Sequence, residues 1–120
     1  MADSTITMSV RRVDAMISII DIHGDITAFA EAELMRAYTE ATEPGARAII
    51  LNFTGLEYMN SSGIGLIVTL MIRMNRLKQR LFAYGLSDHY THIFALTRLN
   101  EAIGTYDTEA AAIAAAARER

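Results

Sequence analysis

Several residue types are scarce in this 120-residue chain, and each scarcity narrows the class of protein. There is no cysteine, which excludes disulfides, zinc–thiolate sites, iron–sulfur clusters and cysteine nucleophiles. There is only one proline, and 52% hydrophobic against 21% charged residues is a balance typical of a globular protein, not of a disordered or fibrous one. The length predicts one domain over residues 1–120.

Basic charge and long apolar runs are also lacking. Eleven basic against fourteen acidic residues give a formal charge of −3, without a cationic block that could neutralise phosphates, so direct DNA binding is not expected. Residues 1–5 lack the basic start and apolar run of a signal peptide, and no apolar stretch approaches the roughly 18 residues of a membrane span. We therefore expect a cytoplasmic protein without membrane contact.

What is present is an alternation of strand and helix patterns. Apolar residues at every second position over 6–10 and a β-branched run over 16–22 predict two strands joined by a tight turn. Gly24 ends the second strand in a turn with Asp25, and Thr27 is placed to cap a helix with acidic first turns. The later patterns predict a strand over 46–53, a helix over 63–80, a strand over 81–84, a helix from Ser87 to Leu96, a strand over 103–106 and a helix from 107 or 108.

The predicted order is ββαβαβαβα. Strands separated by helix-length segments need crossover connections, so we expect the α/β class, with a mixed, mostly parallel sheet of about five strands covered by helices. The continuous apolar run Ala48-Ile49-Ile50-Leu51 suits a strand that is buried on both faces, so this strand is expected at the centre of the sheet.

The most informative segment covers residues 52–66, where a hydrophobic strand runs into a polar turn and two serines stand at the start of a helix. In one interpretation Ser61 or Ser62 merely caps the helix, and Gly63 and Gly65 let it approach the sheet. In the other, one of the serines is a phosphorylation site. A helix N-terminus tolerates phosphate, so the fold would persist, while about two added negative charges would change the exposed surface that a partner meets. The residues alone leave both interpretations open.

A resemblance to a known family rests on this strand, the apolar helix and the residues between them, Asn52-Phe53-Thr54-Gly55-Leu56-Glu57-Tyr58-Met59-Asn60-Ser61-Ser62-Gly63. Together they resemble the signature of bacterial anti-sigma factor antagonists, the STAS domain family, over nearly the whole chain. The resemblance implies partner switching. The unmodified antagonist binds an anti-sigma factor that is also a serine kinase and so frees the sigma factor; phosphorylation ends this binding and a serine phosphatase restores it.

By the same resemblance the phosphorylated residue is Ser61, with Ser62 as the second choice, and the antagonist is not an enzyme and needs no cofactor or metal. The expected partner-binding surface surrounds the start of the second helix. Its residues are Asp25, Thr27, Asn60, Ser61, Ser62, Gly63, Ile64 and Val68. On that helix we expect Leu66, Ile67, Leu70, Met74 and Leu77 to enter the core, while the flank of Ile64, Val68 and Ile72 serves either packing or the partner.

Two positions depart from the family pattern. Asn60 stands where family members commonly have Asp, and Thr27 where they often have Asp. Asparagine keeps hydrogen-bonding ability but lacks a carboxylate that a kinase could recognise. A second hypothesis is therefore a non-switching STAS subunit of a multiprotein signalling assembly, and self-association stays open.

Other site types receive less support from the sequence. A serine hydrolase could be imagined from Ser61, His23 or His89, and Asp25, but the Gly-x-Ser-x-Gly elbow is missing. His89 and His92 are spaced to share a helix face, yet a metal site needs more ligands. The glycines at 63 and 65 lack the rest of a nucleotide-binding fingerprint, so a nucleotide or small anion at this helix end is only a minor option.

Overall fold

The computed structural model describes residues 5–43 and 45–118, which form one five-stranded sheet with helices packed on it. Its strands are β1 (Ile6–Arg12), β2 (Ile17–Ile26), β3 (Ala48–Met59), β4 (Arg80–Tyr84) and β5 (Gly104–Tyr106). Its helices are α1 (Glu31–Thr42), α2 (Ser61–Arg76), α3 (Asp88–Leu96) and α4 (Glu109–Arg118), with 3-10 turns η1 (Ala28–Ala30) and η2 (Leu99–Glu101). The α/β class and the order ββαβαβαβα are confirmed.

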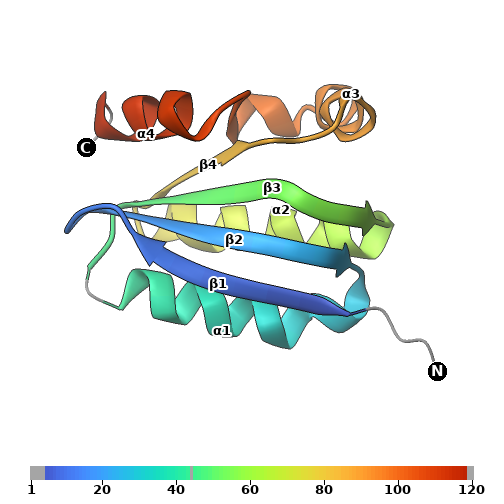
Figure 1. Ribbon diagram of the computed structural model, residues 1–120, viewed down its shortest axis with the longest axis horizontal. Coiled ribbons are helices and arrows are strands. Elements are labelled where there is room, and N and C mark those ends of the chain that lie inside the picture. Colours follow the sequence, from blue (N-terminus) through green and yellow to red (C-terminus); the bar gives the residue numbers. More distant parts are fainter. Residues whose placement is uncertain (1–4, 44, 119–120) are drawn as a thin grey trace.

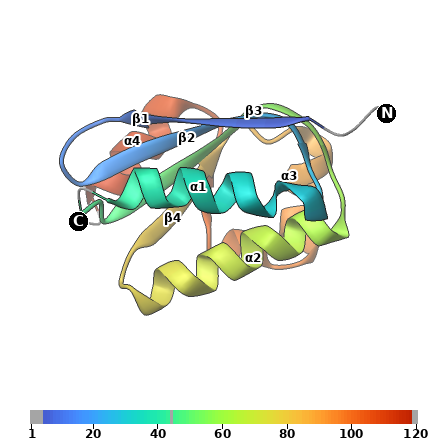
Figure 2. The same ribbon diagram turned by 90° about the horizontal axis from the view of Figure 1, so that it is seen from below.

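The strands follow one another across the sheet in the order β1-β2-β3-β4-β5. β1 and β2 are antiparallel, as a short connection allows, whereas the pairs β2–β3, β3–β4 and β4–β5 are parallel and are connected through helices. β3 therefore lies at the centre, as its apolar run predicts. Helices α1 and α2 cover one face of the sheet, and α4 lies on the other (Figure 1; Figure 2).

Alternating side chains of the central strands supply a core on each face. Ile49, Leu51 and Phe53 of β3 point into the larger cluster beneath α1 and α2, while Ala48 and Ile50 point into the smaller cluster beneath α4. The phenyl ring of Phe53 meets that of Phe94 on α3 edge to face, at 6.2 Å between ring centroids, so α3 belongs to the larger cluster. Side chains of β3 thus pack into the core on both faces of the sheet.

The prediction of a polar turn after residue 53 is wrong, because β3 continues to Met59. The expected turn at Gly24 and Asp25 is wrong as well, because β2 continues to Ile26. The two extensions pair with each other, with Gly24 opposite Leu56 and Asp25 opposite Tyr58, and a register shift between Gly24 and Asp25 accommodates the φ of +107° at Gly24. Strand pairing therefore overrides the local turn signal.

The bounds of two helices also differ from the prediction. α2 begins at Ser61 and ends at Arg76, four residues before the expected end, and Lys78 beyond it has a φ of +60°. Leu77 is 56% exposed, so its expected place in the core is wrong, whereas Ile67, Leu70 and Met74 are buried as predicted. Thr27 caps the 3-10 turn η1 and not α1, which follows directly at Glu31.

The end of α3 at Leu96 and its cap at Ser87 agree with the sequence pattern. Across the described part of the chain, none of the helices has both the length and the apolar character needed to cross a membrane.

Candidate functional site

The serine segment lies where two parallel strands end next to each other. β2 ends at Ile26 and β3 at Met59, which are opposite one another in the register, and α2 starts two residues after Met59. The backbone N–H of Asn60 donates to the carbonyl oxygen of Ile26 at 3.3 Å, which fixes the exit from β3 to the end of β2. This arrangement places α2 at the carboxyl edge of the sheet, where α/β proteins commonly carry their sites.

Asn60, and neither serine, is the N-cap of α2. Its backbone is extended, and its side-chain Oδ1 accepts a hydrogen bond from the Gly63 N–H at 2.9 Å. The interpretation of Ser61 or Ser62 as the cap is therefore wrong. Asparagine and aspartate cap through the same acceptor geometry, so Asn60 supports the helix start as an aspartate would, but without the negative charge.

Ser61 and Ser62 are exposed and occupy the first two positions of α2. Within residues 5–43 and 45–118, neither hydroxyl makes a hydrogen bond to a histidine or a carboxylate, which is the contact that the hydrolase alternative calls for. Both hydroxyls are open to a second protein, and the helix start presents partial positive charge to any group placed on them.

Gly63 is buried in the contact between the first turn of α2 and β2. A Cβ atom at this position would lie 2.0 Å from the carbonyl oxygen of Ile26 and 3.0 Å from its Cγ2. A glycine is therefore required for the approach of α2 to the strand end, as the sequence suggests. Gly65 has no atom within 4 Å of such a Cβ, so the close approach involves only the first of the two glycines.

Asp25 and Thr27 come to this edge on the neighbouring strand, but their exposure differs. Asp25 is half-buried and lies opposite Tyr58 in the register. Thr27 is 8% exposed, and its Oγ1 accepts from the Phe29 N–H at 3.2 Å. Thr27 thus caps η1 and offers little exposed surface to a partner.

Along α2, the flank that follows the serines is partly covered. Ile64 and Val68 are half-buried and pack against the larger core cluster, while Ile72 is 44% exposed. The packing role that the sequence offered for this flank is thus confirmed for Ile64 and Val68. Ile72, together with the exposed parts of Ile64 and Val68, leaves an apolar strip along the helix after the serines.

Two aromatic side chains near the serines were missed by the sequence reasoning. Phe29 on η1 is 88% exposed, and Tyr58 near the end of β3 is 50% exposed. η1 contacts α2. Phe29 is three residues from Ile26, so its Cα lies within about 11 Å of the Cα of Ile26, whose carbonyl oxygen accepts the Asn60 N–H. The available signal was an aromatic residue between two alanines directly after a capping threonine.

The charges around the serines are mainly acidic. Asp25 and Glu57 form no ion pair with any of the described residues. The first arginine of α2 is Arg73, and twelve residues of helix place it about 18 Å along the axis from Ser61. A phosphate on Ser61 would thus meet the partial charge of the helix start but no nearby basic side chain of α2.

The end of β3 is also held from α3. The Met59 N–H donates to the hydroxyl oxygen of Tyr90 at 2.8 Å, in a buried contact. The ring of Tyr90 also contacts the ring of its neighbour His89, at 4.8 Å between centroids. His89 and His92 are both exposed, and the described residues contain no group of three or more His, Asp or Glu side chains placed to hold a metal ion.

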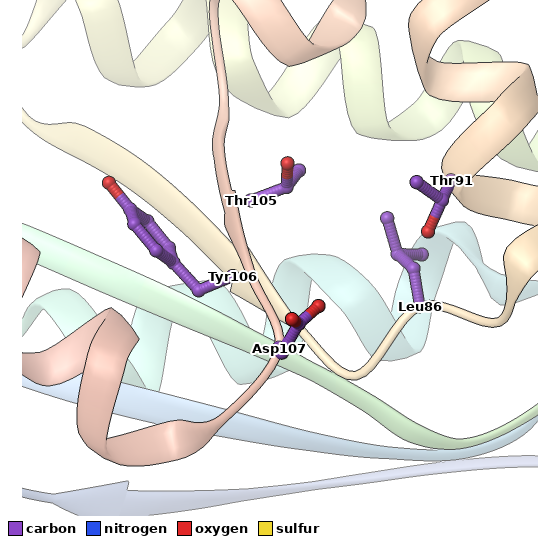
Figure 3. A pocket seen from close by; sticks show the side chains of 5 residues that line it. All are labelled: Leu86, Thr91, Thr105, Tyr106 and Asp107. Atoms are coloured by element: carbon purple, nitrogen blue, oxygen red, sulfur yellow. The ribbon is translucent and has the colours of Figure 1, made fainter.

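A small pocket of about 50 Å³ lies elsewhere, at the ends of β4 and β5. It is lined by Leu86, Thr91, Thr105, Tyr106 and Asp107 (Figure 3). None of the expected site residues lines it, and its volume is far below the roughly 300 Å³ at which small-molecule sites begin. This pocket gives no support to the nucleotide option.

The fold and these contacts define an α/β domain that exposes a pair of serines at a helix start on the carboxyl edge of its sheet. The family model of the STAS domain matches residues 8–112, and the chain belongs to this family. The family and the fold that the resemblance implies are thereby confirmed.

Individual relatives agree with this assignment. The chain is 28% identical over 82 residues to the anti-sigma-B factor antagonist of Staphylococcus aureus (strain NCTC 8325 / PS 47), which covers 68% of this chain and 76% of that protein. An anti-sigma factor antagonist from Mycobacterium paratuberculosis superposes with a TM-score of 0.79 at 18% identity, over 93% of this chain and 94% of that one, which shows likeness of fold. The Bacillus cell fate determinant SpoIIAA in its phosphorylated form gives 0.68 at 25% identity, over 95% and 100%.

Proposed function

We propose that this chain is an anti-sigma factor antagonist that acts by partner switching. In its unmodified form it binds an anti-sigma factor with serine kinase activity and so releases a sigma factor; phosphorylation of Ser61 ends the binding, and a serine phosphatase restores it. The observation that carries the proposal is the exposed pair Ser61 and Ser62 in the first turn of α2, next to exposed apolar side chains. The relative in Staphylococcus aureus, named an anti-sigma-B factor antagonist, supports it.

A phosphate at Ser61 suits this role because the fold tolerates it while the surface changes. The helix start stabilises negative charge, so the domain stays folded. Asp25 and Glu57 are already negative and Arg73 is distant, so about two further charges remain uncompensated toward a partner. The phosphorylated state of the structural relative SpoIIAA fits such a modification.

The proposed partner surface joins the acidic strand ends to the apolar strip of α2. Its residues are Asp25, Asn60, Ser61, Ser62, Gly63, Ile64 and Val68, with Phe29 and Tyr58 added from the structure and Thr27 contributing through η1. Phe29 is the natural anchor, because a large exposed aromatic ring gains most from burial in a partner's pocket. In this proposal the antagonist is a binding protein and not an enzyme. It acts as a single domain over residues 1–120 and works in the cytoplasm.

The proposal is tested by calorimetric titration of an anti-sigma factor encoded by a neighbouring gene with four forms of the chain. Ser61→Asp should weaken binding at least tenfold, because a carboxylate mimics part of the phosphate charge. Ser61→Ala should bind like the unmodified chain. Ser62→Asp places the same charge on the second candidate serine and shows whether the effect is specific to position 61. Equal affinities of Ser61→Asp and the unmodified chain would contradict the switch.

A second candidate function rests on Asn60. If the kinase needs the carboxylate that family members commonly carry before the serine, this chain binds its partner constitutively, as a non-switching STAS subunit of a multiprotein signalling assembly. The distinguishing result is binding that occurs without modification of Ser61 or Ser62, under conditions in which the same kinase phosphorylates a control substrate.

A further inference from the structure

Among the described residues, β1 is an edge strand of the sheet: one side is paired to β2, and no strand pairs with the other side. In an antiparallel pair, alternate residues direct their backbone N–H and C=O groups away from the partner strand. The contacts of Met8 described below identify the outward set as Ile6, Met8, Val10 and Arg12. Figure 1 shows β1 as the outermost strand, with α1 running beneath it.

Two side chains of α1 reach around this edge and occupy both outward groups of Met8. The Met8 N–H donates to Glu33 Oε2 at 2.9 Å, and the Met8 carbonyl oxygen accepts from Arg36 Nη2 at 2.5 Å. The same two side chains form an ion pair, with Arg36 Nε and Glu33 Oε1 at 2.9 Å. We refer to Glu33 and Arg36 in these contacts as the edge clasp.

The edge clasp mimics a neighbouring strand, because it presents an acceptor to the N–H and a donor to the C=O of one residue. The two side chains of the clasp can move away from Met8 at little cost. Arg36 and Glu33 are 49% and 27% exposed, and exposed ion pairs add little stability. Free edges are known hazards that natural sheets cover with charged side chains.

We propose that the free edge of β1 is a self-association surface for a second copy of this chain, and that the edge clasp keeps it closed. When the clasp opens, the β1 strands of two copies pair antiparallel about a two-fold axis. One register uses the whole outward set of each copy: Met8 pairs with Val10, and Ile6 with Arg12. In that register Ser9 lies on the axis, opposite Ser9 of the second copy.

The side chains of β1 suit this occupant. Ile6, Met8 and Val10 face the apolar layer under α1, while Thr7, Ser9 and Arg11 face the opposite side. The two-fold register continues each layer into the second copy. It also keeps like charges apart, since Arg11 lies opposite Thr7 and Arg12 opposite Ile6. A partner strand of arbitrary sequence would not meet these conditions by symmetry.

The test removes the clasp and measures the molar mass of the chain by light scattering across a concentration series. Glu33→Ala/Arg36→Ala should lower the dimer dissociation constant at least tenfold relative to the unmodified chain. Arg98→Ala/Glu101→Ala is the matched control, because it removes another exposed i,i+3 ion pair, remote from β1, and should leave the molar mass unchanged. Circular dichroism verifies that each variant is folded.

A cysteine then locates the interface, because the chain has none of its own. In the proposed register Ser9 forms a non-hydrogen-bonded pair with its counterpart, at about 4.5 Å between Cα atoms, which suits a disulfide. Ser9→Cys in the clasp-free chain should therefore cross-link two copies under mild oxidation. A clasp-free chain that is folded and stays monomeric, or a dimer in which this cysteine does not cross-link, would overturn the proposal.

If the alanine variant does not fold, Glu33→Met/Arg36→Met replaces it, because methionine is an unbranched residue that favours the helix and lacks both the carboxylate and the guanidinium of the clasp. Ser9→Cys with the clasp intact gives an independent readout that needs neither double variant. Raising the salt concentration screens the ion pair and should speed up cross-linking of this variant. A cross-linking rate that does not change with salt would also contradict the role of the clasp.

Discussion

Gly63 and Ile26 lie so close together that a single added methyl group would not fit between them. A Cβ on Gly63 would be 2.0 Å from the Ile26 carbonyl oxygen, and the same oxygen accepts the Asn60 N–H at 3.3 Å. The end of β2 thus holds both the cap and the first turn of α2. The position of Ser61, which lies between these two contacts in the chain, follows from them.

Gly63→Ala should therefore destabilise the protein by about 1–3 kcal/mol, because the helix start must move away from backbone atoms that cannot yield. Gly65→Ala is the matched control. It has no atom within 4 Å of the added Cβ and should stabilise the helix by up to about 1 kcal/mol. Urea unfolding measures both, and equal effects of the two substitutions would contradict the close contact.

Asn60→Ala should cost about 1 kcal/mol of unfolding free energy, because the Gly63 N–H loses its acceptor. Asn60→Asp should keep the stability, since aspartate caps equally well, and should raise the rate of phosphorylation if the kinase recognises a carboxylate at this position. Thermal unfolding and a timed kinase assay measure the two effects separately. A loss of stability in Asn60→Asp as large as in Asn60→Ala would contradict the capping role.

Phe29→Ala should weaken binding of the anti-sigma factor by about 2 kcal/mol while leaving the unfolding free energy nearly unchanged, because the ring is 88% exposed in the free chain. Leu96→Ala is the control, since Leu96 is 69% exposed at the end of α3. Calorimetric titration and urea unfolding of both variants separate binding from stability. Unchanged affinity of Phe29→Ala would remove this residue from the proposed partner surface.

The ion pair between Arg11 and Asp21 predicts a dependence of stability on pH. Hydrogen bonding from Arg11 is the main cause that holds the pKa of Asp21 below its usual 3.8. Because the folded pKa is lower than the unfolded one, the stabilisation is present above about pH 4 and is lost as the pH falls through the folded value. Since Arg11 is 46% exposed, the contribution is about 1 kcal/mol or less.

Asp21→Asn isolates this contribution. Its thermal midpoint should lie below that of the unmodified chain at pH 7, and the two midpoints should converge below pH 4. Glu33, whose pKa is lowered mainly by Arg36, titrates in both proteins and cancels in the comparison. A difference in midpoints that persists unchanged at the lowest pH would contradict the ionic origin of the effect.

The sequence predicts the elements whose pattern is carried by their own residues. The apolar run from Ala48 to Leu51 identifies the central strand, because a strand buried on both faces needs no polar alternation. Ser87 identifies the start of α3, because its hydroxyl accepts the Tyr90 N–H. In both cases the relevant interactions are local, or depend only on burial.

The carboxyl edge of the sheet is harder to predict, because the decisive contacts join segments far apart in the chain. Gly24 favours a turn by itself, but its pairing with Leu56 keeps it in a strand. Phe29 follows a helix-cap pattern that does not tell which side of η1 faces solvent. The edge clasp on Met8 lies elsewhere in the fold but is hard to predict for the same reason. It joins β1 to α1 through side chains that any exposed helix could carry.

The central claim is that the charge on Ser61 controls binding. The most direct measurement incubates the purified chain with the serine kinase encoded nearest to its gene and ATP, locates the phosphate by peptide mass spectrometry, and measures binding of that kinase before and after. The account predicts one phosphate, on Ser61, and loss of binding. Binding that persists after Ser61 is fully phosphorylated would contradict it.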